Sequence, residues 1–289
     1  MKILQFYEMK EKPVISLEFF PPKDIDAFDK DVDELMLLKP DYVTVTFGAG
    51  GSTRDGSYKT VKKLIEDKNL PVVAYIAGYG LSPKEITDVL DKYQALGIGT
   101  IFVIRGDKPR EADFKPHPES FTYAYEMIGF IKEHYDFTLG CAGYPEGHLE
   151  AESLEADIEH LKLKIDSGAE YIVTQYCYDH GMYADFVKKC RAVGIDVPII
   201  PGIMPVYSIK LTNMLSRLCG ATVPEEMRQK LDSLAEAGGE AVLDYGIDQA
   251  VEHCRGLLRQ NVPGLHFYTM DRSRSTSEIV RRLKADNLL

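Results

Sequence analysis

Residues 72–105 read VVAYIAGYGLSPKEITDVLDKYQALGIGTIFVIR and contain one complete strand–helix–strand unit. Short β-rich runs stand at its two ends, over 72–77 and 100–105, and a charged stretch with helical periodicity fills 83–95 between them. Ser82-Pro83 provides the cap and the first residue of this helix, and a glycine follows its end, where a left-handed residue is favourable. The segment therefore predicts two strands joined by a helix.

The same alternation continues in both directions along the chain. Six further β-rich runs cover 14–19, 42–47, 137–142, 170–175, 197–201 and 264–269. Seven more helices are predicted at 26–38, 55–67, 120–134, 151–166, 180–193, 208–218 and 273–285, and extra helices at 224–236 and 240–260 fill the long interval before the eighth strand. This order predicts an α/β fold, a (β/α)8 TIM barrel with extra helices before its eighth strand. A doubly wound open sheet is the alternative, because alternation alone does not require closure.

The composition is that of one globular domain. Hydrophobic residues make up 45% of the 289 residues and charged residues 27%, which excludes disorder, collagen and coiled coil for the chain as a whole. No linker rich in Ser, Gly or Pro divides it, so we expect a single barrel domain over residues 1–289.

Charge and cysteine content restrict the partners and the compartment. The net charge is −11 and there is no run of Lys or Arg, so we expect no nucleic-acid partner, whereas a small anion could still be held by a few local cations. The five cysteines form no CxxC pair and indicate free thiols. The chain shows no signal peptide and no membrane-spanning stretch. We therefore expect a cytoplasmic protein with no membrane partner.

Polar side chains stand at the predicted carboxyl ends of the strands, where barrels carry their reactive groups. Glu18 is the most informative of them. It precedes the apolar segment 19–22, so its carboxyl group should be partly desolvated and its proton affinity raised, as suits a general acid. An ion-paired Glu at a strand end is the alternative. The other end residues are Thr46, Tyr75, Arg105-Gly106-Asp107, Tyr144 to His148, Gln175 and Asp271-Arg272.

Other patterns allow two interpretations each. Arg105-Gly106-Asp107 places a cation and an anion around a flexible residue, which suits a ligand or a structural ion pair. Asp157, His160 and Lys164 share one helix face, which could bind a phosphate or sugar or simply face solvent. No HxH or HExxH spacing accompanies His148, so we expect no metal site. The chain has neither a Walker motif nor GxGxxG.

Seven motifs occur in one order along nearly the whole chain and together resemble those of the methylenetetrahydrofolate reductase family. The chain is similar to the short bacterial-type members, which contain the catalytic barrel only. The motifs are Ser16-Leu17-Glu18-Phe19-Phe20-Pro21-Pro22-Lys23, Val43-Thr44-Val45-Thr46-Phe47-Gly48-Ala49, Arg105-Gly106-Asp107, Tyr144-Pro145-Glu146-Gly147-His148, Thr174-Gln175-Tyr176, Ile200-Pro201-Gly202-Ile203-Met204-Pro205 and His266-Phe267-Tyr268-Thr269.

The resemblance implies non-covalent FAD at the strand ends. NADH or NADPH reduces the flavin and leaves, and 5,10-methylenetetrahydrofolate then receives the hydride from flavin N5 in a ping-pong order. The implied catalytic residues are Glu18, as the donor of the proton that opens the folate ring, and Asp107, which contacts the pterin. Gln175 and Arg272 complete the implied folate site, with Arg272 available to a folate carboxylate. A homo-oligomer is also implied.

The implied FAD site extends over several loops. It comprises Ala49, Arg105, Gly106, Asp107, Tyr123, Ala124, Tyr144, His148, Ala151, Asp157 and Lys164, and Thr46 is implied as a cofactor-binding residue near the nicotinamide. Tyr75 and His160 are added because one stands at a strand end and the other on the helix face of Asp157.

The chain departs from better-known bacterial members at several of these places. Tyr75 and His160 replace His and Asn, Phe47 and Leu163 replace Tyr and Arg, and Leu211 and Leu215 replace a Gln and an aromatic residue.

Two other functions fit parts of the pattern. One is a non-catalytic barrel that binds flavin or folate as an assembly partner, although such a protein would have no need of Glu18, Asp107 and Gln175. The other is an aldolase with a Schiff-base lysine, but the sixth strand ends in Gln175, not in a lysine.

Overall fold

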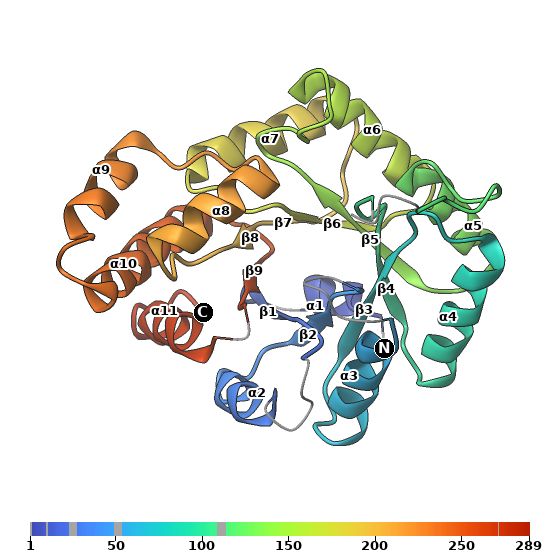
Figure 1. Ribbon diagram of the computed structural model, residues 1–289, viewed down its shortest axis with the longest axis horizontal. Helices are drawn as coiled ribbons and strands as arrows, with labels where there is room; N and C mark the ends of the chain where they lie inside the picture. Colours follow the sequence, from blue (N-terminus) through green and yellow to red (C-terminus); the bar gives the residue numbers. More distant parts are fainter. Residues whose placement is uncertain (1, 10, 23–27, 49–53, 109–113, 271) are drawn as a thin grey trace.

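The computed structural model describes residues 2–9, 11–22, 28–48, 54–108, 114–270 and 272–289. Within them a ring of parallel strands stands at the centre and helices surround it (Figure 1). Along the chain the strands are β1 (Val14–Phe19), β2 (Tyr42–Val45), β3 (Val72–Ala77), β4 (Thr100–Ile104), β5 (Thr138–Gly143), β6 (Tyr171–Thr174), β7 (Ile199–Ile200), β8 (Gly202–Ile203) and β9 (Gly264–Tyr268).

The ring closes through a strand that is interrupted once. β7 pairs with β6, β8 pairs with β9, and Pro201 alone separates β7 from β8. Proline has no N–H to give to a neighbouring strand, but its carbonyl still accepts the N–H of His266 at 3.1 Å. Residues 199–203 therefore form the seventh of eight barrel strands. The predicted (β/α)8 barrel is confirmed, and the open sheet is wrong.

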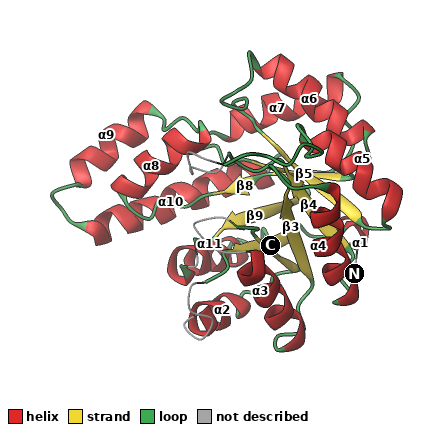
Figure 2. Cartoon of the chain, turned by 45° about the vertical axis from the view of Figure 1, so that its right-hand side comes forward, coloured by secondary structure: helices red, strands yellow, loops and turns green. Residues whose placement is uncertain are grey.

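The helices follow the predicted order. Those after the strands are α2 (Phe28–Met36), α3 (Arg54–Glu66), α4 (Pro83–Ala95), α5 (Ala124–His134), α6 (Leu154–Asp166), α7 (His180–Ala192), α8 (Ile209–Cys219) and α11 (Ser273–Ala285). The predicted extra helices are α9 (Glu225–Leu234) and α10 (Gly239–Leu258), which extend with α8 to one side of the barrel (Figure 2). None of the helices in the described ranges is long and apolar enough to cross a membrane.

One helix was not predicted. α1 (Leu4–Met9) precedes β1 and lies at the end of the barrel where the strands begin. The Ile3 N–H donates to Oγ1 of Thr100, the first residue of β4, at 3.1 Å. The hydroxyls of Tyr7 and Tyr42, the first residue of β2, lie 2.8 Å apart. Six residues are too short for a periodic pattern, so the sequence gives no signal for this helix.

The two faces of the strands differ in polarity. Outward residues such as Leu17 and Val43 are fully buried against the helices in one apolar core. Alternate residues point into the barrel, and there Ser16, Glu18 and His266 are buried. A barrel interior is normally filled by branched apolar side chains, so this polar filling calls for a functional explanation.

Candidate active site

An open hollow of about 1010 Å³ lies at the carboxyl ends of β4 and β5; we call it the β4–β5 hollow. Its wall combines basic, acidic and aromatic side chains from the two strands, the loops that follow them, α5 and α6. The lining residues are Val103, Ile104, Arg105, Tyr123, Ala124, Tyr125, Ala142, Tyr144, His148, Glu150, Ala151, Asp157, His160 and Lys164. Nine of the fourteen residues predicted to bind the cofactors are in this wall.

Two cations reach the β4–β5 hollow from different elements. Arg105 follows β4, and its Nη1 lies 2.6 Å from Oε2 of Glu150, a side chain that is 64% exposed. Lys164 comes from α6 and donates from Nζ to the Ala142 carbonyl at 2.7 Å. Its Nζ also lies 5.8 Å from the centre of the Tyr144 ring. The hollow thus has the local positive charge that the chain lacks overall.

Asp157 provides a buried carboxyl group in the same wall. Only 7% of the residue is exposed, and burial raises its pKa above the ordinary value although the charges of Lys164, His148 and His160 oppose the shift. Asp157, His160 and Lys164 on α6 all line the β4–β5 hollow, with Asp157 buried and His160 exposed. A desolvated carboxylate among cations is suited to accept hydrogen bonds from ligand hydroxyl groups.

The outer end of the β4–β5 hollow is aromatic. The Tyr123 and Tyr125 rings stack with centroids 5.5 Å apart and planes 11° apart, and the Tyr123 ring is 6.2 Å from that of His160. Tyr123 is 47% exposed, so one of these rings offers a free surface to a planar ligand.

Glu18 is held at the barrel mouth by a tyrosine. The Tyr75 hydroxyl donates to Glu18 Oε2 at 2.7 Å, and the Tyr75 ring stacks on Phe102 with centroids 4.6 Å apart. Burial raises the pKa of Tyr75 well above its usual value, and the charge of Glu18 raises it further. Tyr75 therefore stays protonated and remains a donor. Glu18 itself is only 5% exposed.

Gln175 and Tyr144 connect the mouth with the β4–β5 hollow. A smaller cleft between the two contains Gln175, Tyr176 and Cys219, and Tyr144 lines both spaces. Tyr268 on β9 is half-buried near Glu18; burial raises its pKa, and the charge of Glu18 raises it further.

The remaining expected site residues differ in burial. Thr46 is buried with its hydroxyl unpartnered among the described residues. Gly106 has a positive φ of 84°, and the Asp107 side chain after it is exposed. Arg272 is exposed, with its guanidinium carbon 5.4 Å from the centre of the Tyr207 ring. Ala49 lies outside the described residues.

Sequence reasoning missed several residues of this region. Glu150 pairs with Arg105, and Tyr125 stacks on Tyr123 in the wall of the β4–β5 hollow. His266 lies behind Glu18, with its Nε2 3.8 Å from Oε2. Only His266 left a signal in the sequence, because a histidine at an inward position of a buried strand is out of place unless it has a polar partner.

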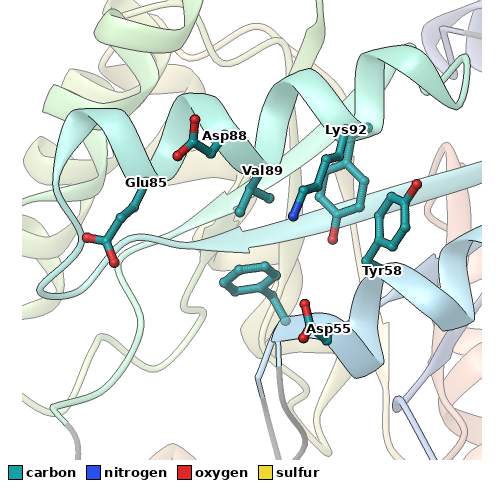
Figure 3. Close-up of a pocket in the computed structure, with 8 residues that line it drawn as sticks. Asp55, Tyr58, Glu85, Asp88, Val89 and Lys92 are labelled. Carbon is teal, nitrogen blue, oxygen red and sulfur yellow. The ribbon is translucent and has the colours of Figure 1, made fainter.

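Figure 3 shows a second hollow, of about 590 Å³, between α3 and α4. Two of its carboxylates stabilise α4: Glu85 accepts the Ser82 N–H at 2.9 Å, and Asp88 forms an ion pair with Lys84 at 2.9 Å. None of the expected site residues lines it. Across the described part of the chain, no three His, Cys, Asp or Glu side chains converge as a metal site would require.

Comparisons with known proteins point to one family. A family model described as methylenetetrahydrofolate reductase matches residues 2–284. Methylenetetrahydrofolate reductase 1 of Schizosaccharomyces pombe is 33% identical over 282 residues, which are 96% of this chain and 47% of that protein. The 5,10-methylenetetrahydrofolate reductase of Pectobacterium carotovorum subsp. carotovorum is 34% identical over 279 residues, which are 96% of this chain and 92% of that protein.

Solved structures show the same fold. An uncharacterized protein from Clostridium thermocellum, which binds two copies of 5-methyl-5,6,7,8-tetrahydrofolic acid, superposes with a TM-score of 0.70 at 17% identity and covers 99% of both chains. At this identity the likeness concerns the fold alone.

Proposed function

The chain belongs to the methylenetetrahydrofolate reductase family, and on this premise we propose that it reduces 5,10-methylenetetrahydrofolate to 5-methyltetrahydrofolate with bound FAD and with NADH or NADPH as reductant. The chain spans about half the length of the S. pombe relative but 92% of the bacterial one. The observation that carries the proposal is a buried, hydrogen-bonded Glu18 near the carboxyl end of β1 in a barrel whose β4 and β5 ends form a hollow lined by cations.

The donor set of the β4–β5 hollow fits FAD. Lys164 and Arg105 would hold the diphosphate, because guanidinium and ammonium groups pair with phosphate oxygens. Asp157 would accept hydrogen bonds from ribose hydroxyls, and the exposed face of Tyr123 would stack on the adenine ring. When bound, FAD would take a hydride from the nicotinamide and pass it to the folate.

Glu18 would act on the folate as a general acid. Opening the five-membered ring of the substrate requires a proton on the departing nitrogen, and a carboxyl group shielded from water can hold that proton in place. Its 2.7 Å hydrogen bond to Tyr75 fixes one carboxyl oxygen, so the other is free to face the substrate. Asp107, Gln175 and Arg272 would hold the pterin and the folate carboxylates.

Tyr75 has a contact that the sequence did not predict. It was predicted as a neighbour of the flavin, and its hydroxyl also donates a hydrogen bond to Glu18. We propose that Tyr75 is a positioning residue for the acid. Because the chain retains a buried acid with its own donor, we favour the reductase over a non-catalytic barrel that only assembles with partners.

The absorption spectrum tests the proposal. The purified protein should be yellow with bound FAD, lose this colour with NADH or NADPH under anaerobic conditions, and recover it when 5,10-methylenetetrahydrofolate is added. Glu18→Gln should keep the first two properties and slow the recovery by about 10²- to 10⁴-fold, the usual contribution of a general acid.

Glu170→Gln is the matched control. It changes a carboxylate at the opposite end of the barrel that is ion-paired to Lys132 at 2.6 Å, and it should leave the recovery unchanged. A colourless protein that binds no added FAD would refute the proposed function. Equal recovery by Glu18→Gln and the parent would remove Glu18 from its role.

A further inference from the structure

A column of hydrogen-bonding side chains runs through the barrel from α1 to Glu18. At the outer end the hydroxyls of Tyr7 and Tyr42 are 2.8 Å apart. The Tyr42 hydroxyl is hydrogen-bonded to Ser16, which lies opposite it in the β1–β2 register. Ser16 Oγ is 2.8 Å from Nδ1 of His266, and Nε2 of the same ring points to Glu18.

The last step of the column contains an unused polar atom. His266 is fully buried, and its Nε2 has no hydrogen-bond partner among the described residues. It lies 3.8 Å from Oε2 of Glu18, which is just beyond hydrogen-bond distance. Oε2 also accepts the Tyr75 hydroxyl, and because a carboxylate oxygen can accept a second donor, a small rotation about that hydrogen bond would bring it within reach of Nε2. A buried imidazole nitrogen without a partner is costly, so its position one rotation away from the acid calls for a reason.

We propose that this column, Tyr7–Tyr42–Ser16–His266, delivers protons to Glu18 from the end of the barrel opposite the mouth. The inference rests on the proposed function, because that reaction removes one proton from Glu18 in each turnover. His266 gives its Nε2 proton to the Glu18 carboxylate and accepts one on Nδ1 from Ser16. Tyr42 then donates a proton to Ser16, Tyr7 donates one to Tyr42, and solvent donates one to Tyr7. One proton enters and one is delivered, and the His266 ring, left protonated on Nδ1, returns to the Nε2 tautomer before the next delivery.

Burial limits the access of protons to Glu18 from the mouth. Its carboxyl side chain is 6% exposed, and ligands at the mouth would cover what remains. At the other end of the column Tyr7 on α1 is partly exposed as a residue, whereas Ser16, Tyr42 and His266 are fully buried. Each of the four groups can accept a proton on one side and donate on the other, which a column of apolar side chains could not do.

The test separates the first turnover from the later ones. In Tyr7→Phe, Tyr42→Phe and Ser16→Ala, the proton for the first turnover can be taken up during equilibration before mixing, so a single turnover of folate by the reduced enzyme should keep the parent rate. Multiple turnovers need a new proton each time, so the steady-state rate should fall about tenfold or more, with a larger solvent deuterium isotope effect. Ser16→Thr keeps the hydroxyl and should restore the rate.

Tyr171→Phe is the matched control. Its hydroxyl is buried in the same interior and has no hydrogen-bond partner among the described residues, so its removal breaks no link. This variant should show parent rates in both experiments.

A second readout uses the protein without flavin or substrate. Exchange of the His266 ring proton with solvent, followed by NMR on ¹⁵N-histidine-labelled protein, should slow in Tyr7→Phe and not in Tyr171→Phe.

Three results would overturn the column. The first is an unchanged steady-state rate in all three variants. The second is a first turnover slowed as much as the later ones, which would mean that the column only positions Glu18. The third is ring-proton exchange equal to that of the parent. Failure of the proposed function is distinct, because then the parent itself would not transfer hydride to folate.

Discussion

Replacing Glu150 by Gln should tighten FAD binding. In the structure Glu150 holds Arg105 through a 2.6 Å ion pair, and in the proposed FAD site the diphosphate would have to displace this carboxylate to reach the guanidinium group. The pair is partly exposed, with 31% of the Arg105 side chain and 64% of the Glu150 side chain accessible. Exposed pairs contribute about 0.2–1 kcal/mol, which converts to an affinity gain between about 1.4-fold and fivefold.

The assay is titration of the flavin-free protein with FAD, followed by quenching of flavin fluorescence at low ionic strength. Glu155→Gln is the control, because Glu155 pairs with Lys189 at 2.7 Å and does not line the β4–β5 hollow. In an Arg105→Met background Glu150→Gln should have no effect, since the competition it relieves is absent. Weaker binding by Glu150→Gln, or the same gain in both backgrounds, would refute the reasoning.

Three further substitutions test burial. Burial raises the pKa of Asp157 in the folded protein, so ionisation of this carboxyl group destabilises the fold as pH rises through that pKa. Asp157→Asn should therefore raise the Tm of the flavin-free protein more at pH 8 than at pH 4, and it should weaken FAD binding. Burial lowers the pKa of His253 to about 4, so the unfolding free energy of the parent should fall by up to about 3 kcal/mol between pH 6.5 and pH 4. Urea titrations at these two pH values should show a smaller fall in unfolding free energy for His253→Gln. Gly140→Ala should cost about 1–3 kcal/mol in urea unfolding, since its Cβ would lie 2.1 Å from Cζ of the buried Tyr171.

Local signals explain which elements could be predicted from sequence. The bounds of α4 are as predicted because Ser82 and Glu85 form a capping box and Pro83 follows the cap. β1 and β3 were also predicted to the residue. The split of the seventh strand at Pro201 and the helix α1 depend on neighbours that are distant in sequence, so no local pattern could show them.

In the candidate site, too, local signals indicated some residues, whereas contacts between residues distant in sequence could not be predicted. The rule that barrel chemistry lies at strand ends led to Glu18 and Arg105, and helical spacing led to the α6 face of Asp157 and Lys164. Glu150 could not be found, because an exposed glutamate in a loop has no pattern that tells which cation it meets. Tyr75 was found, but its partner was not, because a hydrogen bond across the barrel depends on the side-chain direction.

The division between the two strand faces explains how the barrel tolerates a polar interior. On β1, Leu17 and Phe19 are fully buried in the outer core, while Ser16 and Glu18 alternate with them inside. A shift of one residue would exchange these sets, so the outer core fixes the register without help from the interior. The interior is then free to hold groups chosen for chemistry. It follows that Ser16→Ala should cost about 1–3 kcal/mol of unfolding free energy, because it leaves the buried His266 Nδ1 without its partner, whereas Leu17→Ala should cost about 2–5 kcal/mol through lost packing.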